Sequence, residues 1–283
     1  PGCLMPKVPY LRLAIVSLAI GAVIAVLMVQ IDWNGEAGST AAGPIDTLLD
    51  WMIVVSSFVF AIVCVFLGYA LYRWRVKPGD ESDGLPIHGN TKLELVWTII
   101  PTVIVLFAAG YSWAVLDDIE EVDSDPLIVN VYSQQFAWTF GYPTEGNKWS
   151  EGEFHVPVGR QVVFNMNAQD VLHSFWVPEW RIKKDNVPGI TTDAVVTPDR
   201  VGTFQLICTE LCGAGHSVMR AKVVVEPVKK FNRWVKRLDE KVPTGLILTA
   251  DQALEIQRQI QKAEGGIGGS GVDETTRDNV TQS

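Results

Sequence analysis

Four side chains that bind soft metal ions lie within twelve residues of this sequence. Cys208, Cys212, His216 and Met219 offer two thiols, one imidazole and one thioether. Sulfur ligands combined with imidazole select copper over hard cations, and a methionine is typical of electron-transfer copper sites. A blue site with one copper needs one Cys, one Met and two His, and the extra thiol here permits two coppers bridged by two sulfurs. The segment therefore predicts a copper centre.

Other interpretations of the two cysteines stay open on residue types alone. Zn²⁺ also binds Cys and His, and in an oxidising compartment Cys208 and Cys212 could form a disulfide or stay as buried thiols. The methionine and the four-residue spacing of the cysteines favour copper. Among the four histidines, His173 is the best second imidazole, because it follows a predicted strand 35 residues before Cys208. We interpret His88 and His155 as surface or loop residues.

The metal-binding side chains need a rigid frame, and the sequence around them predicts an all-β sandwich. Short runs of β-branched and aromatic residues alternate with turn sequences such as Pro157-Val158-Gly159, as in antiparallel sandwiches. Val162, Phe164 and Met166 form the apolar face of one run. The predicted strands are residues 127–132, 136–142, 153–156, 161–167, 192–196, 203–207 and 221–225.

Three apolar windows precede this domain, at residues 13–31, 51–72 and 95–116, and none contains Asp, Glu, Lys or Arg. Each window is long enough to cross a hydrocarbon core of roughly 30 Å. Arg73 and Arg75 follow the second window and place its end in the cytoplasm by the positive-inside rule. The third window then runs outward, so the chain after about residue 117 lies on the extracytoplasmic side.

The first window has the flanks of a secretory signal as well as of a signal-anchor. We prefer a retained helix, because 19 apolar residues are long for the core of a signal peptide. Cys3 lacks a preceding apolar run, so we interpret it as an ordinary cysteine rather than a lipidated one.

Charge is distributed unevenly along the chain. All 55 charged residues lie outside the three windows, and the net charge is −9. This distribution excludes a purely soluble enzyme, a fully embedded transporter and a disordered chain. We expect an N-terminal hydrophobic segment and linker (1–44), a transmembrane hairpin (45–116) and an extracytoplasmic β domain (117–243). The last part of the chain (244–283) is expected to form a polar helix at 250–264, followed by a tail that is too polar to order by itself.

The cysteine segment resembles a known family motif. It matches C-x-E-x-C-G-x-x-H-x-x-M of subunit II of the haem-copper cytochrome c oxidases, and residues 171–178 resemble that family's V-L-H-S-x-x-V-P stretch. His88-Gly89 and residues 93–101 resemble the start of its second transmembrane helix. The similarity extends over most of residues 45–235.

The resemblance implies a cupredoxin domain that holds a binuclear copper centre, CuA, bridged by Cys208 and Cys212. It implies that His173 and Met219 complete one copper, and that His216 and the backbone carbonyl of Glu210 complete the other. The implied metal ligands are thus His173, Cys208, Glu210, Cys212, His216 and Met219.

Further residues receive roles only through the resemblance. The Glu210 carboxylate would bind a Mg²⁺ shared with the catalytic subunit, with Lys183 and Asp185 near that ion. Glu94 borders the third window on its cytoplasmic side, where the residue type alone favours an interfacial carboxylate. The resemblance instead assigns Glu94 to the mouth of a proton path into the catalytic subunit.

One position departs from the family pattern. The family reads Q-W-x-W where this chain reads Gln135-Phe136-Ala137-Trp138, and the first Trp accepts electrons from cytochrome c in the family. We therefore expect electrons to arrive through Phe136 or through Trp138, the nearest remaining indole. A membrane-tethered or complex-bound cytochrome becomes an alternative to a soluble donor. Acidic residues between 117 and 125 could attract a basic donor or simply be solvated.

The resemblance implies the copper-carrying subunit of a terminal oxidase in a bacterial cytoplasmic membrane. Such a subunit passes electrons from cytochrome c to the haem of the catalytic subunit, where oxygen is reduced to water and protons are translocated. The implied partners are catalytic subunit I, other oxidase subunits, cytochrome c and membrane lipid, without nucleic acid. The equivalent subunit of a quinol oxidase would lack the copper ligands. An alternative from a different functional class is a membrane-anchored module that binds or delivers copper.

Overall fold

The computed structural model describes residues 8–76, 78–79, 89–246, 252, 254–255 and 258–259. By its contacts the chain divides into two units. The first comprises the chain up to Ala37 together with Ala41–Glu121, and the second comprises Gly38–Thr40 and the chain from Val122 onward. Cys3, His88 and the predicted polar tail after residue 264 lie outside the described residues.

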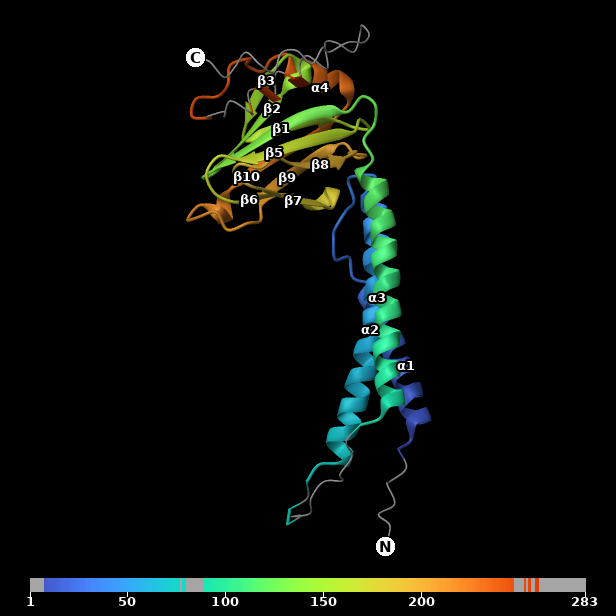
Figure 1. Cartoon of the computed structure of the whole chain (residues 1–283). Coiled ribbons are helices and arrows are strands. Elements are labelled where there is room, and N and C mark those ends of the chain that lie inside the picture. The colour runs from blue at the N-terminus through green and yellow to red at the C-terminus, as the bar shows by residue number, and fades with distance from the viewer. Residues whose placement is uncertain are drawn as a thin grey trace, which may run out of the picture. The chain divides into compact units, whose positions relative to one another are not determined.

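Among the described residues, the first unit consists of three long helices (Figure 1). They are α1 (Tyr10–Val29), α2 (Ala42–Arg73) and α3 (Thr91–Glu120). All three are long and apolar enough to cross a membrane, which confirms the three predicted apolar helices. Each helix begins before its charge-free window, because polar residues at a helix end still join the backbone hydrogen bonding.

Small residues let α1 pack closely on α2. Ser17, Gly21 and Ala25 recur every four residues and are buried. A β-carbon on Gly21 would lie 2.6 Å from the ring of Phe58 and 3.2 Å from its α-carbon. This spacing of small residues is the one that lets helix backbones approach each other in lipid.

We expect Gly21→Ala to destabilise the packing of α1 on α2 by about 1–3 kcal/mol, because the added methyl group must displace Phe58. Gly68→Ala in α2 is the matched control, since nothing lies within 4 Å of a β-carbon there. Unfolding of the two variants in mixed micelles, followed by circular dichroism, measures the difference. Equal stability of the two variants would contradict the close contact.

The second unit is a β-sandwich, and in the part of the chain that the structure describes its two layers are five-stranded sheets (Figure 1). Its strands are β1 (Leu127–Gln134), β2 (Ala137–Tyr142), β3 (Lys148–Glu151), β4 (Glu153–Pro157), β5 (Val162–Ala168), β6 (His173–Val177), β7 (Ile182–Asn186), β8 (Thr192–Val196), β9 (Gly202–Cys208) and β10 (Arg220–Glu226). One sheet has the order β3-β2-β1-β5-β8, and the other has the order β4-β10-β9-β6-β7. The predicted all-β sandwich is confirmed.

Alternating side chains build the core between the two sheets. Val162, Phe164 and Met166 of β5 are fully buried, as their period of two predicts. Phe154 of β4 lies at the centre of an aromatic cluster. Its ring centroid is 4.6 Å from that of Phe140 and between 5.6 and 6.1 Å from those of Phe164, Phe175 and Trp180. The core holds the strand ends in fixed positions.

The sequence patterns do not predict β3, β6 or β7. β3 and β7 are edge strands, where charged side chains are tolerated because one strand edge has no partner. Helix α4 (Val228–Val235) is also missed, as are the short 3₁₀ helices η1 (Pro143–Glu145), η2 (Pro178–Trp180) and η3 (His216–Val218). Within the predicted polar helix at 250–264, the described residues 252, 254–255 and 258–259 are helical.

The connection between α1 and α2 contributes a short segment to the sandwich. The Ser39 hydroxyl donates to the carbonyl of Trp180 at 2.9 Å, and the backbone N–H of Gly38 donates to the carbonyl of Glu179 at 2.7 Å. Thr40 donates its N–H to the carbonyl of Thr197 at 3.0 Å. Residues Gly38–Thr40 therefore belong to the second unit, although they lie between α1 and α2 in the chain.

Candidate metal centre

The predicted ligands come from the end of β9, the loop after it and the start of β6, which lie together at one end of the sandwich. β9 ends at Cys208, and the ligand loop (residues 209–219) connects it to β10. His173 is the first residue of β6, which pairs with β9 so that Phe175 lies opposite Cys208. Gln135 and Phe136 form the turn between β1 and β2. The pairing of β6 with β9 thus carries a distant histidine to the ligand loop.

Each cysteine lies beside the other cysteine and beside one imidazole. The Sγ atoms of Cys208 and Cys212 are 3.9 Å apart. Cys208 Sγ is 3.8 Å from His173 Nδ1, and Cys212 Sγ is 3.7 Å from His216 Nδ1. Met219 Sδ lies 3.7 Å from Cys212 Sγ. The structure therefore brings together the predicted sulfur and imidazole groups.

The group is largely buried. Cys208, Cys212, His173 and Met219 are buried, and His216 is partly exposed. The donor atoms of His173, Cys208 and Cys212 all lie within 4.8 Å of one another. Among the described residues, no other three His, Cys, Asp or Glu side chains bring their donor atoms this close together. The backbone carbonyl oxygen of Glu210 is 3.4 Å from Cys208 Sγ.

The surroundings of the two thiols favour a thiolate at Cys208. Burial raises the pKa of Cys208, but contact with the imidazole of His173 and with nearby backbone groups lowers it to about 6. Burial and the negative charge of Cys208 raise the pKa of Cys212 to about 11. Near neutral pH the metal-free pair therefore carries one negative charge, and a metal that binds both sulfurs must displace the second proton.

Asp170 is a residue of this site that sequence reasoning missed. Its Oδ1 atom lies 2.9 Å from His173 Nε2 and accepts the N–H of Val171 at 2.7 Å. Its Oδ2 atom accepts the N–H of Gln135 at 2.7 Å. A carboxylate on one ring nitrogen fixes the tautomer of a histidine and directs the other nitrogen to the metal. Here that contact leaves Nδ1 facing Cys208.

The ionisation of Asp170 and His173 is coupled through this contact. Burial raises the pKa of Asp170, but hydrogen bonds from His173, Gln135 and Val171 outweigh it and lower the pKa. Burial lowers the pKa of His173, but contacts with Cys208 and Asp170 raise it overall. An acidic residue three positions before a candidate histidine is the signal that could have indicated this pair.

Phe136 covers the ligand loop. A β-carbon on Gly215 would lie 2.5 Å from the Phe136 ring, and one on Gly213 would lie 3.2 Å from it. The side-chain amide of Gln135 donates to the carbonyl of Cys212. The Phe136 side chain is 41% exposed, so the ring both contacts the loop and faces solvent.

Trp138 occupies a different environment from Phe136. It is buried in the sandwich core, and its ring centroid is 6.3 Å from that of His173. Of the two candidates for electron acceptance, Phe136 therefore lies at the surface and Trp138 lies behind a candidate ligand.

The other predicted site residues lie outside this cluster. Lys183 and Asp185 are on β7, opposite Trp176 and Ser174 in the register with β6. Within the described residues the metal-ligand group contains no carboxylate, so the Mg²⁺ prediction depends on the resemblance alone. Glu94 belongs to α3, where its Oε1 atom accepts the backbone N–H of Asn90 at 3.0 Å. This contact caps the start of the helix.

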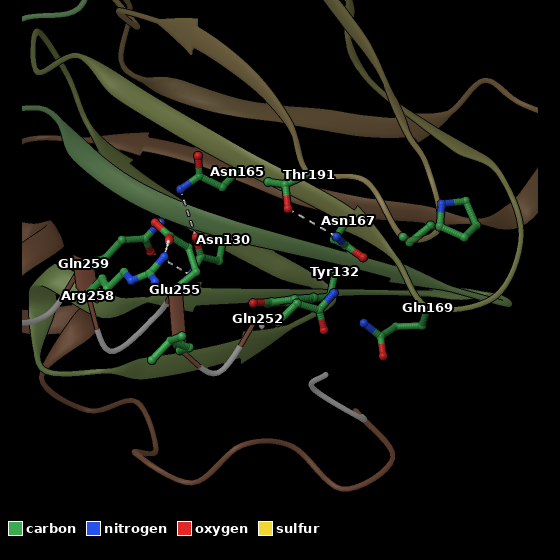
Figure 2. A pocket seen from close by; sticks show the side chains of 14 residues that line it. Asn130, Tyr132, Asn165, Asn167, Gln169, Thr191, Gln252, Glu255, Arg258 and Gln259 are labelled. Carbon is green, nitrogen blue, oxygen red and sulfur yellow. Dashed lines mark hydrogen bonds and ion pairs between the residues drawn. The ribbon is translucent and has the colours of Figure 1, made fainter. Parts of the chain in front are cut away.

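A polar cavity of about 680 Å³ lies over β1 and β5, away from the ligand loop. Figure 2 shows amide side chains of both strands pointing into it. Asn165 Nδ2 donates to Asn130 Oδ1 at 3.2 Å, and Asn130 Nδ2 donates to Gln259 Oε1 at 3.1 Å. None of the candidate metal ligands lines this cavity, so it is separate from the metal centre.

The sandwich, its sulfur-rich loop and the apolar helices define a membrane-anchored protein with a cupredoxin-like domain. The family model described as cytochrome c oxidase subunit II, periplasmic domain, matches residues 148–228. The model described as cytochrome c oxidase subunit II, transmembrane domain, matches residues 34–115. The chain therefore belongs to the cytochrome c oxidase subunit II family.

Individual relatives agree with this membership. The chain is 32% identical over 276 residues to cytochrome c oxidase subunit 2 of Synechocystis sp., with 78% of this chain and 82% of the relative covered. It is 28% identical over 215 residues to quinol oxidase subunit 2 of Bacillus cereus, with 74% and 72% covered. The periplasmic domain of subunit II of cytochrome oxidase from Bradyrhizobium japonicum has 26% identity and a TM-score of 0.40, covering 42% of this chain and 96% of that one. The named relatives are thus oxidase subunits.

Proposed function

We propose that this chain is the copper-carrying subunit of a terminal cytochrome c oxidase. In this role it accepts electrons from a cytochrome c and passes them to the haem of the catalytic subunit, which reduces oxygen to water and translocates protons. The observation that carries the proposal is the pair of cysteine sulfurs 3.9 Å apart with one imidazole beside each. We expect the equivalent subunit of a quinol oxidase to lack these ligands.

The donor set fits two copper ions. The two cysteine sulfurs, which lie 3.9 Å apart, would hold the metals together with the imidazole beside each sulfur. We assign His173, Cys208, Glu210 (through its backbone carbonyl), Cys212, His216 and Met219 as ligands. Soft sulfur donors with imidazole suit copper better than hard cations. Bound copper would supply one-electron redox chemistry.

The protein residues around the ligands would hold their geometry fixed. Asp170 orients His173 through its 2.9 Å contact with Nε2. Gln135 holds the ligand loop by donating to the carbonyl of Cys212. The aromatic core behind β6 and β9 limits movement of the strand ends, and Phe136 keeps water from one face of the loop. Ligands held in this way would move little when bound copper changes its oxidation state.

The donor would approach the exposed side of the ligand loop. Leu211 is 78% exposed and Val218 is 75% exposed, and both belong to the loop that Phe136 covers. We propose that the donor cytochrome c contacts this apolar rim and that Phe136 is the nearest aromatic ring, with Trp138 buried behind it. Such a rim suits a membrane-tethered or complex-bound cytochrome, because a held donor needs fewer charges for steering.

We also propose the membrane arrangement and the remaining roles. Arg73 and Arg75 at the end of α2 support a cytoplasmic location of that end by the positive-inside rule, and in this arrangement the sandwich would lie on the extracytoplasmic side of a bacterial membrane. In the assembled oxidase, Glu94 would stand at the mouth of a proton path. The carboxylate of Glu210, with Lys183 and Asp185 nearby, would hold a Mg²⁺ shared with catalytic subunit I.

The metal content and spectrum of the full chain test the proposed function. We expect two coppers per chain and, in the oxidised form, a purple mixed-valence spectrum in which one unpaired electron is shared by both metals. A blue spectrum with one copper per chain would overturn the proposal, as would stoichiometric zinc binding without copper. Either result would favour a copper-binding module or a structural zinc site instead.

A further inference from the structure

Helix α4 and the turn after it carry five cations and no acidic residue. These cations are Lys229, Lys230, Arg233, Lys236 and Arg237. On the opposite face, Phe231, Trp234 and Val235 are buried in the sandwich. All charged residues of this exposed segment are therefore basic, although the chain as a whole has a net charge of −9.

Three of these cations line a cavity of about 500 Å³. Lys230 and Arg233 are three residues apart on α4 and so project from the same side of the helix. Arg237 follows four residues later in the turn after the helix and lines the same cavity. His155, Glu226 and Trp234 complete the lining. Lys229 and Lys236 belong to the same basic segment but do not line the cavity.

One wall of the cavity is a fixed aromatic stack. The ring of His155 lies parallel to that of Trp234, with centroids 3.8 Å apart and an interplanar angle of 8°. His155 Nδ1 is 2.8 Å from Glu226 Oε1, which holds the ring in place. His155 lies on β4 and is partly buried, so it is not a loop histidine, although its ring reaches this cavity at the surface.

The cavity has an excess of positive charge. Glu226 is the one acidic side chain in its lining, and its carboxylate is already hydrogen bonded to His155. In the part of the chain that the structure describes, the ion pairs do not include Lys230, Arg233 or Arg237. Three exposed cations therefore converge without a carboxylate of their own.

We propose that this basic cavity binds a multivalent oxyanion of the phosphate type, such as pyrophosphate or the phosphate chain of a nucleotide. Each guanidinium group of Arg233 and Arg237 presents parallel N–H donors that match two phosphate oxygens. Lys230 adds a compact charge. A volume of about 500 Å³ is in the range of small-molecule sites. A phospholipid headgroup shares this chemistry with a soluble phosphate compound.

Titration calorimetry of the full chain in a neutral detergent, with pyrophosphate at low ionic strength, tests the proposal. We expect saturable binding at one site per chain. Arg233→Gln should weaken binding at least tenfold, and Arg233→Lys should recover only part of the loss because lysine cannot form the paired hydrogen bonds. Lys236→Gln, the matched control, makes the same change in charge outside the cavity and should alter the affinity less than twofold.

A second titration separates the two sources of phosphate. Dihexanoyl phosphatidylglycerol, kept below its critical micelle concentration, presents a lipid headgroup in soluble form. Stronger binding of pyrophosphate assigns the cavity to a soluble oligophosphate, and stronger binding of the lipid assigns it to a headgroup.

Two results would overturn the proposal. The first is no saturable binding of pyrophosphate or of the lipid to the unaltered chain. The second is equal weakening by Arg233→Gln and Lys236→Gln, because that would show general attraction to the basic face rather than a site. Both side chains are exposed, so the variants should fold, and circular dichroism checks this. Copper content and oxidase activity play no part in the measurement.

Discussion

Replacing Cys212 by serine is expected to lower the copper content from two ions per chain to one at most and to abolish the mixed-valence spectrum. The Sγ atom of Cys212 lies within 3.9 Å of Cys208 Sγ, His216 Nδ1 and Met219 Sδ. The substitution removes one of the two cysteine sulfurs, and His216 and Met219 then lose the sulfur that lies beside both of them. A serine hydroxyl is a much poorer ligand for copper. Metal analysis and electron paramagnetic resonance of the full chain measure the change.

Cys64→Ser provides the matched control for this substitution. Cys64 is a free, exposed cysteine in α2, so its replacement makes the same chemical change away from the ligand loop. We expect that variant to keep two coppers and an unaltered spectrum. If Cys212→Ser also kept both, the proposed ligand set would be wrong.

Asp170→Asn is expected to lower the affinity for copper by about 10- to 100-fold, the usual effect of removing a residue that orients a metal ligand. The carboxylate of Asp170 accepts hydrogen bonds on both oxygens, from the backbone N–H groups of Val171 and Gln135, while Oδ1 also contacts His173. An amide has one oxygen, so one of these donors would face an N–H₂ group. The imidazole of His173 would then lose its fixed orientation. Competition with a chromophoric chelator of Cu⁺ measures the affinity.

The control for Asp170→Asn is Asp193→Asn. Asp193 is an exposed residue of β8, so this variant loses the same charge without touching the ligand loop. We expect its affinity to match that of the unaltered chain. Equal affinities in all three proteins would show that Asp170 does not orient His173.

The predictability of the site depends on how local its residues are. Cys208 ends β9, and Cys212, His216 and Met219 lie in the loop directly after it, so their spacing alone indicates a common metal. His173 reaches the loop only because β6 pairs with β9, and a pairing between distant strands is not visible in residue types. The contacts that Gln135 makes with Asp170 and Cys212 depend on which turns meet at one end of the sandwich, so residue types do not indicate them. The contact of Asp170 with His173 is local, and its three-residue spacing is the one signal in the sequence that could indicate it.

The same distinction applies to the fold. The apolar windows predict α1 to α3 because a charge-free run of that length has few alternatives. Alternation predicts β5, whose apolar face is buried. It fails for β7, whose charged residues are accommodated at a sheet edge. It also gives no sign that β1 pairs in parallel with β5, or β4 with β10, because those pairings join segments far apart in the chain.

The contact between Phe136 and Gly215 limits which residues can occur together at the two positions. With a β-carbon at 215 only 2.5 Å from the aromatic ring, alanine at that position is compatible only with a smaller or displaced side chain at 136. A lineage that keeps an aromatic residue at the surface of the ligand loop must therefore keep glycine beneath it. The two positions are expected to vary together across relatives, so that glycine at 215 occurs where residue 136 is aromatic.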